Sequence, residues 1–402
     1  MNILFTIYKS LGYGGAEVST RMLAERLTKR GHKVIIASTQ DYQGLNTRKF
    51  KEFHKIPSYS YQENYLSDFL KKIILEEKID IVHSQDRLTS IPAVLAANQS
   101  KIPVVVHFRD YWYACPRSSC LTPDYENYDL CSYSIILTKF PFYRWPFDMY
   151  KWHYLKKSWK VLEKADAKIC SSEMEKEKLR LCGVISNVNV IPISREVEFY
   201  SKHVEDKTYR KKYNLKGVVV SCVGSLFYTK GVPVLLRIIP LILRENKDIT
   251  FLIVGDGPMM KDLQAMIKEN NIQDNVVLTG RLPLEEIPKI YAASDIVIQP
   301  VIWKEPFSGV PIEVGASKKP LISSDIGAIR EMQGEFKVLV PPFDYWGWKN
   351  SILKLAKDKE LRERLGENGY KVMEERYDNE IVVTQIEDLY KGLIKLGREN
   401  IL

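Results

Sequence analysis

Apolar strand-like segments alternate with helical patterns along almost the whole chain, and this alternation restricts the possible folds more than any other feature. The first half contains a helical pattern from about Ala16 to Arg30. Its predicted strands are Asn2–Tyr8, Lys33–Ser38, Ile81–Ser84, Val104–His107, Ala167–Ser171 and Val188–Ile191. Strands that are separated by helices pair in parallel, and the helices then cover both faces of the sheet. We therefore expect an α/β fold.

The same alternation starts again in the second half of the chain. Strands are predicted at Gly217–Val223, Ile249–Val254, Val276–Leu278 and Asp295–Gln299, with helices at Val232–Arg244 and Met259–Asn270. The segment Pro192–Leu215 is polar and has no clear period, so we interpret it as an interdomain linker. A chain of 402 residues has room for two domains. We assign them to residues 1–195 and 196–375, with residues 376–402 as a final helix.

The stretch from Val301 to Met332 combines two carboxylates with a predicted helix start. Glu305 lies in a loop after a predicted strand, and Glu313 follows eight positions later in a helix that begins near Ser308. Free backbone N–H groups at a helix start bind anions, and carboxylates accept sugar hydroxyls. The predicted anion-binding groups are those of Phe307, Ser308, Gly309 and Val310. The stretch therefore suits a ligand in which a sugar is joined to a phosphate. The simpler interpretation is that the two glutamates lie on a solvated helix face and bind nothing.

Glycine-rich turns follow several predicted strands, where a backbone without side chains can approach a ligand closely. Any one of them is also compatible with a plain tight turn. The four turns are Gly12-Tyr-Gly14-Gly15-Ala16-Glu17, Gly224-Ser225-Leu-Phe-Tyr-Thr-Lys230-Gly231, Gly255-Asp256-Gly257-Pro258 and Thr279-Gly280-Arg281.

A polar segment, His107-Phe-Arg109-Asp110, follows another predicted strand and leads to Cys115-Pro116. In an extended segment His107 and Arg109 point to the same side. The residues alone do not decide which of the two side chains contacts a ligand. A single histidine at a strand end is most often structural.

Together these motifs resemble the retaining glycosyltransferases of family 4, which have the GT-B fold. Glu305 and Glu313 within EPFSGVPIEVGASKKP resemble the donor-site signature of the family, and Gly14-Gly15-Ala-Glu resembles its GGAE turn. Lys230-Gly231 matches the end of the Gly-Arg-x4-Lys-Gly phosphate loop. Ser225 stands where that loop has arginine, and Arg109 stands where the HDxxxxCP segment has histidine.

The resemblance implies two Rossmann-like domains with the active site in the cleft between them, and a final helix that crosses back to the first domain. It implies a nucleotide-sugar donor, transfer with retention of anomeric configuration, Glu305 on the sugar side and Glu313 on the ribose hydroxyls. The candidate catalytic residues are Glu305, Lys230, His107, Arg109 and Asp110. The candidate donor-binding residues are Gly14, Gly15, Gly224, Ser225, Lys230, Gly255, Asp256, Gly280, Arg281, Phe307, Ser308, Gly309, Val310 and Glu313.

We expect no metal and no other cofactor, because metal-dependent glycosyltransferases usually carry Asp-x-Asp and no two aspartates here are two apart. Lys230 and the helix starts near Gly15 and Ser308 would supply the positive charge instead; Arg281 and Lys304 are candidates to replace the missing arginine at Ser225. Two other functions stay open. A sugar-nucleotide epimerase could use the same fold, and so could a non-catalytic nucleotide-sugar-binding protein, which the missing arginine would suit.

Composition and charge indicate a globular protein whose basic residues are unevenly distributed. Apolar residues make up 45% of the chain, and no run of 18 or more apolar residues and no leader peptide is found, so we expect a cytoplasmic location. Residues 1–195 hold 29 Lys and Arg against 20 Asp and Glu, which accounts for the whole net charge of +9. No nucleic-acid-binding motif accompanies this charge, so we expect no nucleic-acid partner.

The six cysteines show no CxxC pair, and Cys115, Cys120 and Cys131 cluster in one segment. Free thiols are the simpler interpretation, and a zinc or iron–sulfur site is the alternative.

The segment Lys139–Lys160 combines aromatic and basic residues. It holds six Lys and Arg against a single acid, Asp148, and nine of the twenty residues from Phe140 to Trp159 are aromatic. This combination favours the headgroup layer of an anionic membrane, although the rings could instead pack into a core. We expect the segment to dock on the inner face of a membrane and to receive a glycan or lipid-linked acceptor.

Overall fold

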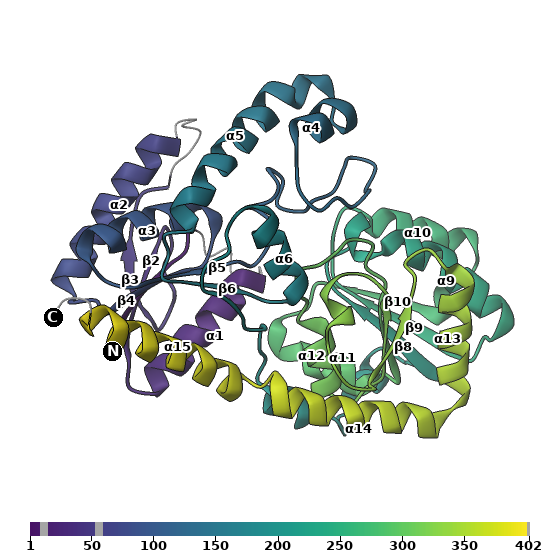
Figure 1. Ribbon diagram of the computed structural model, residues 1–402. Helices are drawn as coiled ribbons and strands as arrows, with labels where there is room; N and C mark the ends of the chain where they lie inside the picture. Colours follow the sequence, from purple (N-terminus) through teal and green to yellow (C-terminus); the bar gives the residue numbers. More distant parts are fainter. Residues whose placement is uncertain (9–14, 53–58, 400–402) are drawn as a thin grey trace. The chain divides into compact units, whose positions relative to one another are not determined.

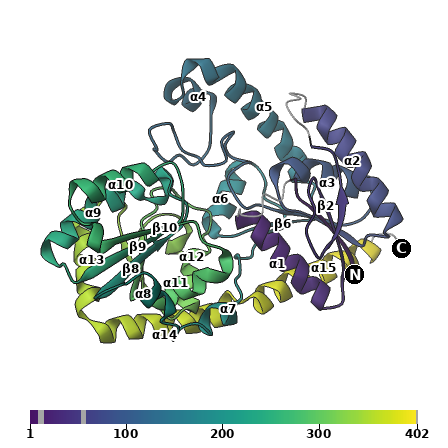
Figure 2. The ribbon, with the colours of Figure 1, turned by 180° about the vertical axis from the view of Figure 1, so that it is seen from behind.

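The chain forms two compact units, each built around one parallel sheet (Figures 1 and 2). The computed structural model describes residues 1–8, 15–52 and 59–399. The first unit comprises Met1–Ile193 and Glu380–Leu402, and the second comprises Ser194–Asn379. The boundaries that we assigned from the sequence were 195/196 and 375/376.

The sheet of the first unit has seven strands, all parallel, in the order β3-β2-β1-β4-β5-β6-β7. Their bounds are β1 Asn2–Thr6, β2 Lys33–Ser38, β3 Asn46–Lys49, β4 Ile81–Ser84, β5 Val104–His107, β6 Ala167–Cys170 and β7 Val188–Val190. The central strands are buried on both faces, as their continuous apolar sequences require.

Helices cover both faces of this sheet. Helices α1 (Gly15–Lys29) and α15 (Asn379–Glu399) pack on one face, where Leu27 and Val383 join the strand residues in one apolar core (Figure 1). On the other face lie α2 (Tyr59–Glu76), α3 (Arg87–Ser100) and α5 (Trp145–Leu162). Asp86 caps α3 by accepting a hydrogen bond from the backbone N–H of Thr89. The remaining helices are α4 (Tyr133–Lys139), η1 (Phe142–Arg144) and α6 (Glu173–Leu181).

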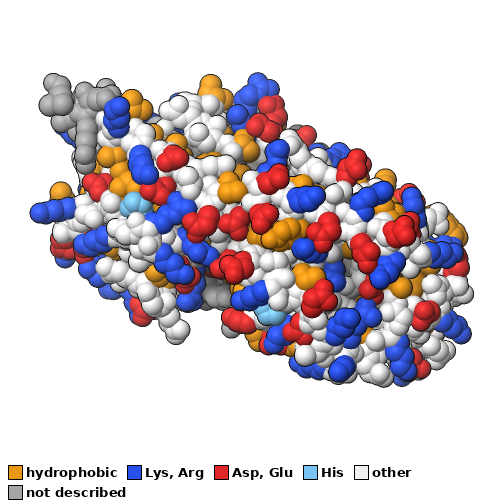
Figure 3. All heavy atoms as spheres, turned by 90° about the horizontal axis from the view of Figure 1, so that it is seen from below, with side chains coloured by type: hydrophobic (Ala, Val, Ile, Leu, Met, Phe, Trp, Pro, Cys, Tyr) orange, Lys and Arg blue, Asp and Glu red, His pale blue; other side chains and the backbone are white. Residues whose placement is uncertain are grey.

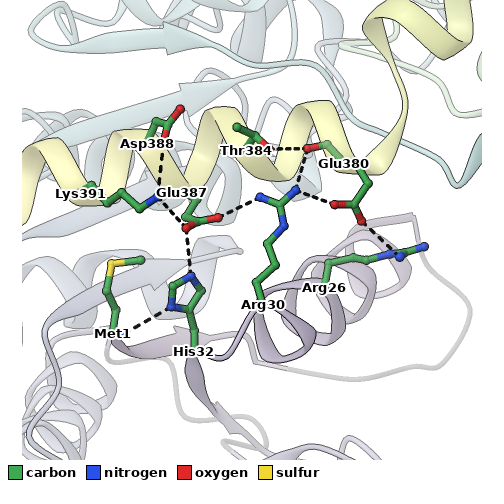
Figure 4. A network of polar contacts seen from close by, with 9 residues as sticks. All are labelled: Met1, Arg26, Arg30, His32, Glu380, Thr384, Glu387, Asp388 and Lys391. Carbon is green, nitrogen blue, oxygen red and sulfur yellow. Dashed lines mark hydrogen bonds and ion pairs between the residues drawn. The ribbon is translucent and has the colours of Figure 1, made fainter.

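A polar network fixes α15 to the segment that ends α1 (Figure 4). Arg30 pairs with Glu387 at 2.9 Å and with Glu380 at 2.6 Å. Glu387 also accepts from Lys391 at 2.8 Å and lies 3.3 Å from His32 Nε2. The last helix is therefore held by charge as well as by its apolar face.

The sheet of the second unit has six parallel strands in the order β10-β9-β8-β11-β12-β13. Their bounds are β8 Val218–Val223, β9 Ile249–Val254, β10 Val276–Gly280, β11 Ile296–Gln299, β12 Leu321–Ser324 and β13 Lys337–Val340. One face carries α9 (Val232–Glu245), α10 (Met260–Glu269) and α13 (Tyr345–Lys357), and the other carries α11 (Ile287–Ala293), α12 (Val310–Ala316) and α14 (Lys359–Arg376). Short turns of 3₁₀ helix are η2 (Tyr228–Lys230), η3 (Gln273–Asn275), η4 (Leu284–Glu286) and η5 (Gly327–Arg330).

Residues 192–215, which we interpreted from their polar composition as an interdomain linker, include the boundary between the two units at 193/194. They contain two short helices, α7 (Val197–Ser201) and α8 (Thr208–Lys212), which pack against α12 and α11 of the second unit. Tyr200 and Tyr209 are buried in these contacts. A few buried residues in an otherwise polar segment give no periodic signal, so these two helices were not predicted from the sequence.

Each sheet has one point at which its strand order reverses, between β1 and β4 in the first unit and between β8 and β11 in the second. At such a point the loops after neighbouring strands diverge to opposite faces and leave a crevice. In the second unit we therefore look for a ligand site where β8 and β11 end.

Candidate functional site

The turns after β8, β9 and β10 are joined by backbone hydrogen bonds into one ledge. The N–H of Gly224 donates to Val254 at 2.9 Å, and the N–H of Gly255 donates to Gly280, also at 2.9 Å. At Gly255 only glycine fits, because φ is +139° and a Cβ would lie 1.9 Å from the carbonyl oxygen of Gly224. The structure thus brings Gly224, Ser225, Gly255, Asp256 and Gly280 together at the carboxyl edge of the sheet.

Lys230 and Glu305 meet where β8 and β11 end. Lys230 closes the turn η2, and its ammonium forms an ion pair with the buried carboxylate of Glu305. The following residue, Gly231, has a φ of +88°, and a Cβ there would lie 1.8 Å from the carbonyl oxygen of Pro300. This close approach of two backbones lets the loop after β8 reach the loop after β11. The sequence predicted both residues at one site, and the structure places them in contact.

A concave pocket opens beside this ion pair. Its polar wall includes Gln299, Glu305, Ser308 and Ser323, and Phe307 lines it as well. The side-chain amide of Gln299 donates to Ser308 Oγ at 2.7 Å and lies 3.5 Å from Glu305 Oε2. A pocket with a carboxylate, an amide and hydroxyl groups can hold the hydroxyls of a sugar.

Glu313 lies in α12 and is buried between two partners that the sequence did not indicate. Its carboxylate accepts from Arg195 Nε at 2.8 Å and from the hydroxyl of Tyr291 at 3.0 Å. Burial, together with the negative charge of Glu313, raises the pKa of Tyr291 well above its ordinary value. A Cβ at Gly309 would lie 2.0 Å from Arg195 Nη2, so this glycine makes room for the guanidinium. Arg195 could not be found from the sequence, because it lies in the segment that we interpreted as a linker.

The backbone N–H groups of residues 307–310, which we predicted to bind an anion, lie at the start of a short helix. Gly309 caps α12 and Val310 begins it, but α12 has only seven residues. A helix of two turns has a small dipole, so it adds little charge to the site compared with Lys230.

In the first unit, His107, Arg109 and Asp110 lie together at the end of β5. His107 is 4% exposed and stacks on His83 with ring centroids 5.4 Å apart. Arg109 donates to Gln85 Oε1 at 2.6 Å, and Asp110 accepts from the backbone N–H of Trp112 at 2.7 Å.

Burial shifts the pKa values of these three groups. It lowers the pKa of His107 well below its usual value, with a further contribution from the charge of Arg109. It also lowers the pKa of Arg109 to about 10 and raises that of Asp110 to about 6. His107 is buried, and Arg109 and Asp110, which follow it closely in the chain, are half-buried.

Two family matches together span most of the chain. Residues 13–195 match the family described as "Glycosyltransferase Family 4", and residues 205–372 match the family described as "Glycosyl transferases group 1". Each half of the chain thus resembles glycosyltransferases.

The curated relatives of this chain are distant. An "Alpha-D-kanosaminyltransferase" of Streptomyces kanamyceticus is 28% identical over 46% of this chain and 48% of its own length. The GPI3 subunit of a Saccharomyces cerevisiae "Phosphatidylinositol N-acetylglucosaminyltransferase" is 26% identical over 79% of this chain and 66% of its own length. An "Alpha-monoglucosyldiacylglycerol synthase" of Streptococcus pneumoniae is 22% identical over 71% of this chain and 62% of its own length. The chain thus spans about half to two thirds of the length of these curated relatives.

A solved structure covers nearly the whole of both chains. The Anabaena protein Alr3699/HepE, solved in complex with UDP, superposes with a TM-score of 0.75 at 18% identity over 98% of this chain and 100% of that chain. This similarity confirms the predicted GT-B fold with two Rossmann-like domains.

Of the remaining predicted donor-site residues, one is not described by the structure. Gly14 lies outside the described residues, and Gly15 begins α1. Arg281 follows β10 directly, on the exposed side of the ledge, and Lys304 precedes Glu305.

The cysteine cluster is buried and does not form a metal centre in the part of the chain that the structure describes. Cys115 Sγ lies 2.8 Å from the hydroxyl of Tyr128. Although burial alone would raise the pKa of Cys115, hydrogen bonds from Cys120 and Tyr128 lower it to about 6. Across residues 1–8, 15–52 and 59–399, no group of three or more His, Cys, Asp or Glu could hold a metal ion.

Proposed function

We propose that the chain transfers a sugar from a nucleotide-sugar to an acceptor hydroxyl, with retention of configuration and without a metal. The observation that carries this proposal is the ion pair of Lys230 and Glu305 beside a polar pocket, at the strand-order reversal of the second unit. The ledge formed by the turns after β8, β9 and β10 lies at the same edge of the sheet.

The reaction needs the two charges that this pair provides. When the bond between the anomeric carbon and the phosphate oxygen breaks, positive charge develops on the sugar and negative charge on the leaving diphosphate. Lys230 stabilises the diphosphate, and Glu305 stabilises the sugar. The acceptor hydroxyl forms the new bond, and its proton ends on the leaving diphosphate. Glu313 and its partner Arg195 face the ribose side of the nucleotide.

The printed titles of similar solved structures support a nucleotide-sugar as the donor. The Anabaena protein was solved with UDP and with UDP-glucose, and its fold is the fold of this chain. Metal independence is supported by the absence of Asp-x-Asp from the sequence and by the position of Lys230.

The acceptor that we propose is a glycan or lipid held at a membrane surface on the cytoplasmic side. Phe142 and Tyr143 are 75% and 72% exposed, and Phe147 and Tyr150 are exposed as well, so these rings of residues 139–160 do not pack into the core. Two of the curated relatives have lipids in their printed names. Within the described residues, no helix is long and apolar enough to cross a membrane.

Product analysis tests the proposal. The purified chain is incubated in EDTA with a panel of nucleotide-sugars and with vesicles that carry lipid acceptors, and the products are separated by mass and by anomeric configuration. We expect a glycosylated acceptor with the configuration of the donor. An isomerised donor would indicate an epimerase, and bound but unchanged donor would indicate a binding protein. Activity that disappears in EDTA and returns with Mg²⁺ would contradict the metal-free mechanism.

A further inference from the structure

The two segments at which the chain enters and leaves the second unit are bonded to each other. The chain passes between the units at 193/194 and again at 379/380. The N–H of Arg195 donates to the carbonyl oxygen of Tyr377 at 3.1 Å, and the N–H of Asn379 donates to that of Arg195 at 3.0 Å. These two bonds form a parallel β-bridge between Arg195 and Asp378. The backbone of Arg195 is therefore fixed on both sides.

The side chain of Arg195 extends from this bridge to the carboxylate of Glu313. Both side chains are 11% exposed, and Arg195 Nε donates to Glu313 Oε1 at 2.8 Å. Nη1 of the same guanidinium donates to the carbonyl oxygen of Ser194 at 2.9 Å. Nη2 occupies the space that a side chain at position 309 would need, which is why glycine stands there. These contacts hold the guanidinium in the orientation in which it meets Glu313.

A tyrosine holds the other oxygen of the same carboxylate. The hydroxyl of Tyr291, a buried residue of α11, donates to Glu313 Oε2 at 3.0 Å. An ionised carboxylate can accept about four hydrogen bonds, two on each oxygen. Arg195 and Tyr291 use one on each oxygen. Each oxygen of Glu313 can therefore still accept a hydrogen bond from a ligand.

The bridge and Glu313 both lie next to the polar pocket described above. The ring of Tyr377 lies 6.0 Å from the ring of Phe307, centroid to centroid, and Phe307 lines that pocket. Pro311, which also lines it, precedes Glu313 by two residues in α12. The carboxylate that Arg195 and Tyr291 hold is thus part of the surroundings of the donor.

A cation beside Glu313 solves an electrostatic problem of such a site. A buried carboxylate without a partner is unfavourable, and it would also repel the phosphates of a nucleotide. Arg195 balances the charge of Glu313 but leaves its oxygens able to accept hydroxyl groups. The pair can therefore bind a sugar hydroxyl through a charged acceptor without adding net negative charge near a diphosphate.

We propose that Arg195 and Tyr291 are positioning residues that keep the carboxylate of Glu313 charged and directed at the ribose hydroxyls of the donor. They act on the donor through Glu313 alone. The preference of the site for a ribonucleotide over a 2′-deoxyribonucleotide then depends on both of them. This inference rests on the proposed nucleotide-sugar donor, whereas its test needs neither an acceptor nor turnover.

Nucleotide binding to the full-length chain tests the proposal. Titration calorimetry compares UDP, GDP and ADP with their 2′-deoxy forms, and the nucleotide that binds most tightly is used further. The measured quantity is the ratio of the two Kd values, deoxy over ribo. A general loosening of the fold weakens both forms alike and leaves this ratio unchanged. We expect a ratio of about ten for the wild type, because one hydrogen bond to a charged acceptor is lost.

Substitutions at the two positioning residues should lower this ratio. Arg195→Met should reduce it to about three, since a carboxylate without its cation is a weaker and less well oriented acceptor. Arg195→Lys keeps the charge but not the planar fork, and its ratio should lie between those of Arg195→Met and the wild type. Tyr291→Phe, which removes a single hydroxyl, should lower the ratio about twofold.

Two matched controls should keep the ratio of the wild type. Arg244→Met changes an exposed arginine at the end of α9. Tyr209→Phe removes the hydroxyl of another buried tyrosine of the same unit, which accepts from Lys212 at 3.2 Å. Melting temperatures show which variants are folded. If Arg195→Met is not, Arg195→Lys and Tyr291→Phe decide the question.

The possible failures are distinct. If no nucleotide binds the wild type, the proposed donor fails and this inference fails with it. If the ribo and deoxy forms bind the wild type equally, Glu313 does not hold the ribose, and the inference is overturned although a nucleotide donor stands. A ratio that stays near ten in the folded variants of Arg195 and Tyr291 would show that these residues serve the fold alone. If the ratios change as expected but no sugar is transferred, the positioning role stands and the proposed transferase activity fails.

Discussion

Lys230 and Glu305 are the residues on which the proposed chemistry depends most directly. Their ion pair places a cation and an anion at the end of β8 and β11. We expect Glu305→Gln to lower kcat more than it weakens UDP-sugar binding, because the charge it removes acts mainly on the developing cation. Lys230→Ala should lower the rate about a hundredfold, as does the loss of one transition-state donor.

Steady-state kinetics and calorimetry of the donor check this prediction. Lys261→Ala, at an exposed position of α10 in the same unit, is the control and should behave like the wild type. An unchanged kcat in Glu305→Gln would remove Glu305 from the mechanism.

Glu313 has a structural partner as well as a proposed ligand. Glu313→Gln should weaken UDP binding by about 1–3 kcal/mol, because ribose hydroxyls lose an ionised acceptor. It should also lower the melting temperature, since the buried Arg195 loses the charge of its partner. The double variant Glu313→Gln, Arg195→Met should recover part of the stability but none of the affinity. A normal affinity for UDP in Glu313→Gln would show that Glu313 serves the fold alone.

The candidate donor residues could be predicted from the sequence wherever a short motif determines a local geometry. Gly255 follows β9 directly, and Lys230 and Glu305 lie in the loops after β8 and β11, so their meeting at one sheet edge follows from parallel topology. Arg195 and Tyr291 could not be predicted as partners of Glu313, because their contact joins segments far apart in the sequence and no motif marks it.

At the scale of elements, the attachment of α15 to the first unit depends on pH. The hydrogen bonds from Lys391 and Arg30 hold the pKa of Glu387 at about 2, below its ordinary value of 4.5. The folded state therefore binds this proton less tightly than the unfolded chain does. The stabilisation is complete above pH 4.5 and is lost as the pH falls from about 4.5 to about 2.

Melting temperatures between pH 7 and pH 3 measure this contribution. Glu387→Gln should melt below the wild type at pH 7, and the difference should shrink toward pH 3. Asp388→Asn is the control, because its carboxylate is 66% exposed and should matter little. A gap between wild type and Glu387→Gln that is the same at both pH values would contradict the linkage.

Most strands could be predicted because they are buried on both faces. The predicted bounds of β2, β4, β5 and β9 agree with the structure. β3, with the sequence NTRK, was not predicted, because it is an exposed edge strand without an apolar pattern. Helices α7 and α8 were missed for a similar reason, since each has only one or two buried residues and no repeating apolar stripe.

At the scale of the whole molecule, two kinds of surface differ in how their charged side chains are distributed. Basic and acidic side chains are interspersed over the face shown in Figure 3. Residues 139–160 differ from that face, because they hold six Lys and Arg against one acid and expose several aromatic rings. A surface with mixed charges is only weakly attracted to an anionic bilayer. An exposed basic and aromatic segment binds it more strongly, because its cations meet anionic lipid and its rings bury apolar area.

Vesicle co-sedimentation tests the membrane proposal. The chain should bind vesicles that contain anionic lipid, and the bound fraction should fall as salt is raised, because screening weakens the attraction. Replacing Lys156, Lys157 and Lys160 by Glu should abolish binding. The matched control replaces Lys359, Arg364 and Lys371 of α14 by Glu, which gives the same change in net charge on the second unit. The Phe142→Ser, Tyr143→Ser variant should also lose affinity although its charge is unchanged, since its rings no longer enter the headgroup layer. Equal binding to neutral vesicles, or an equal loss in the α14 control, would show that residues 139–160 do not dock on a membrane, and a soluble acceptor would then be favoured.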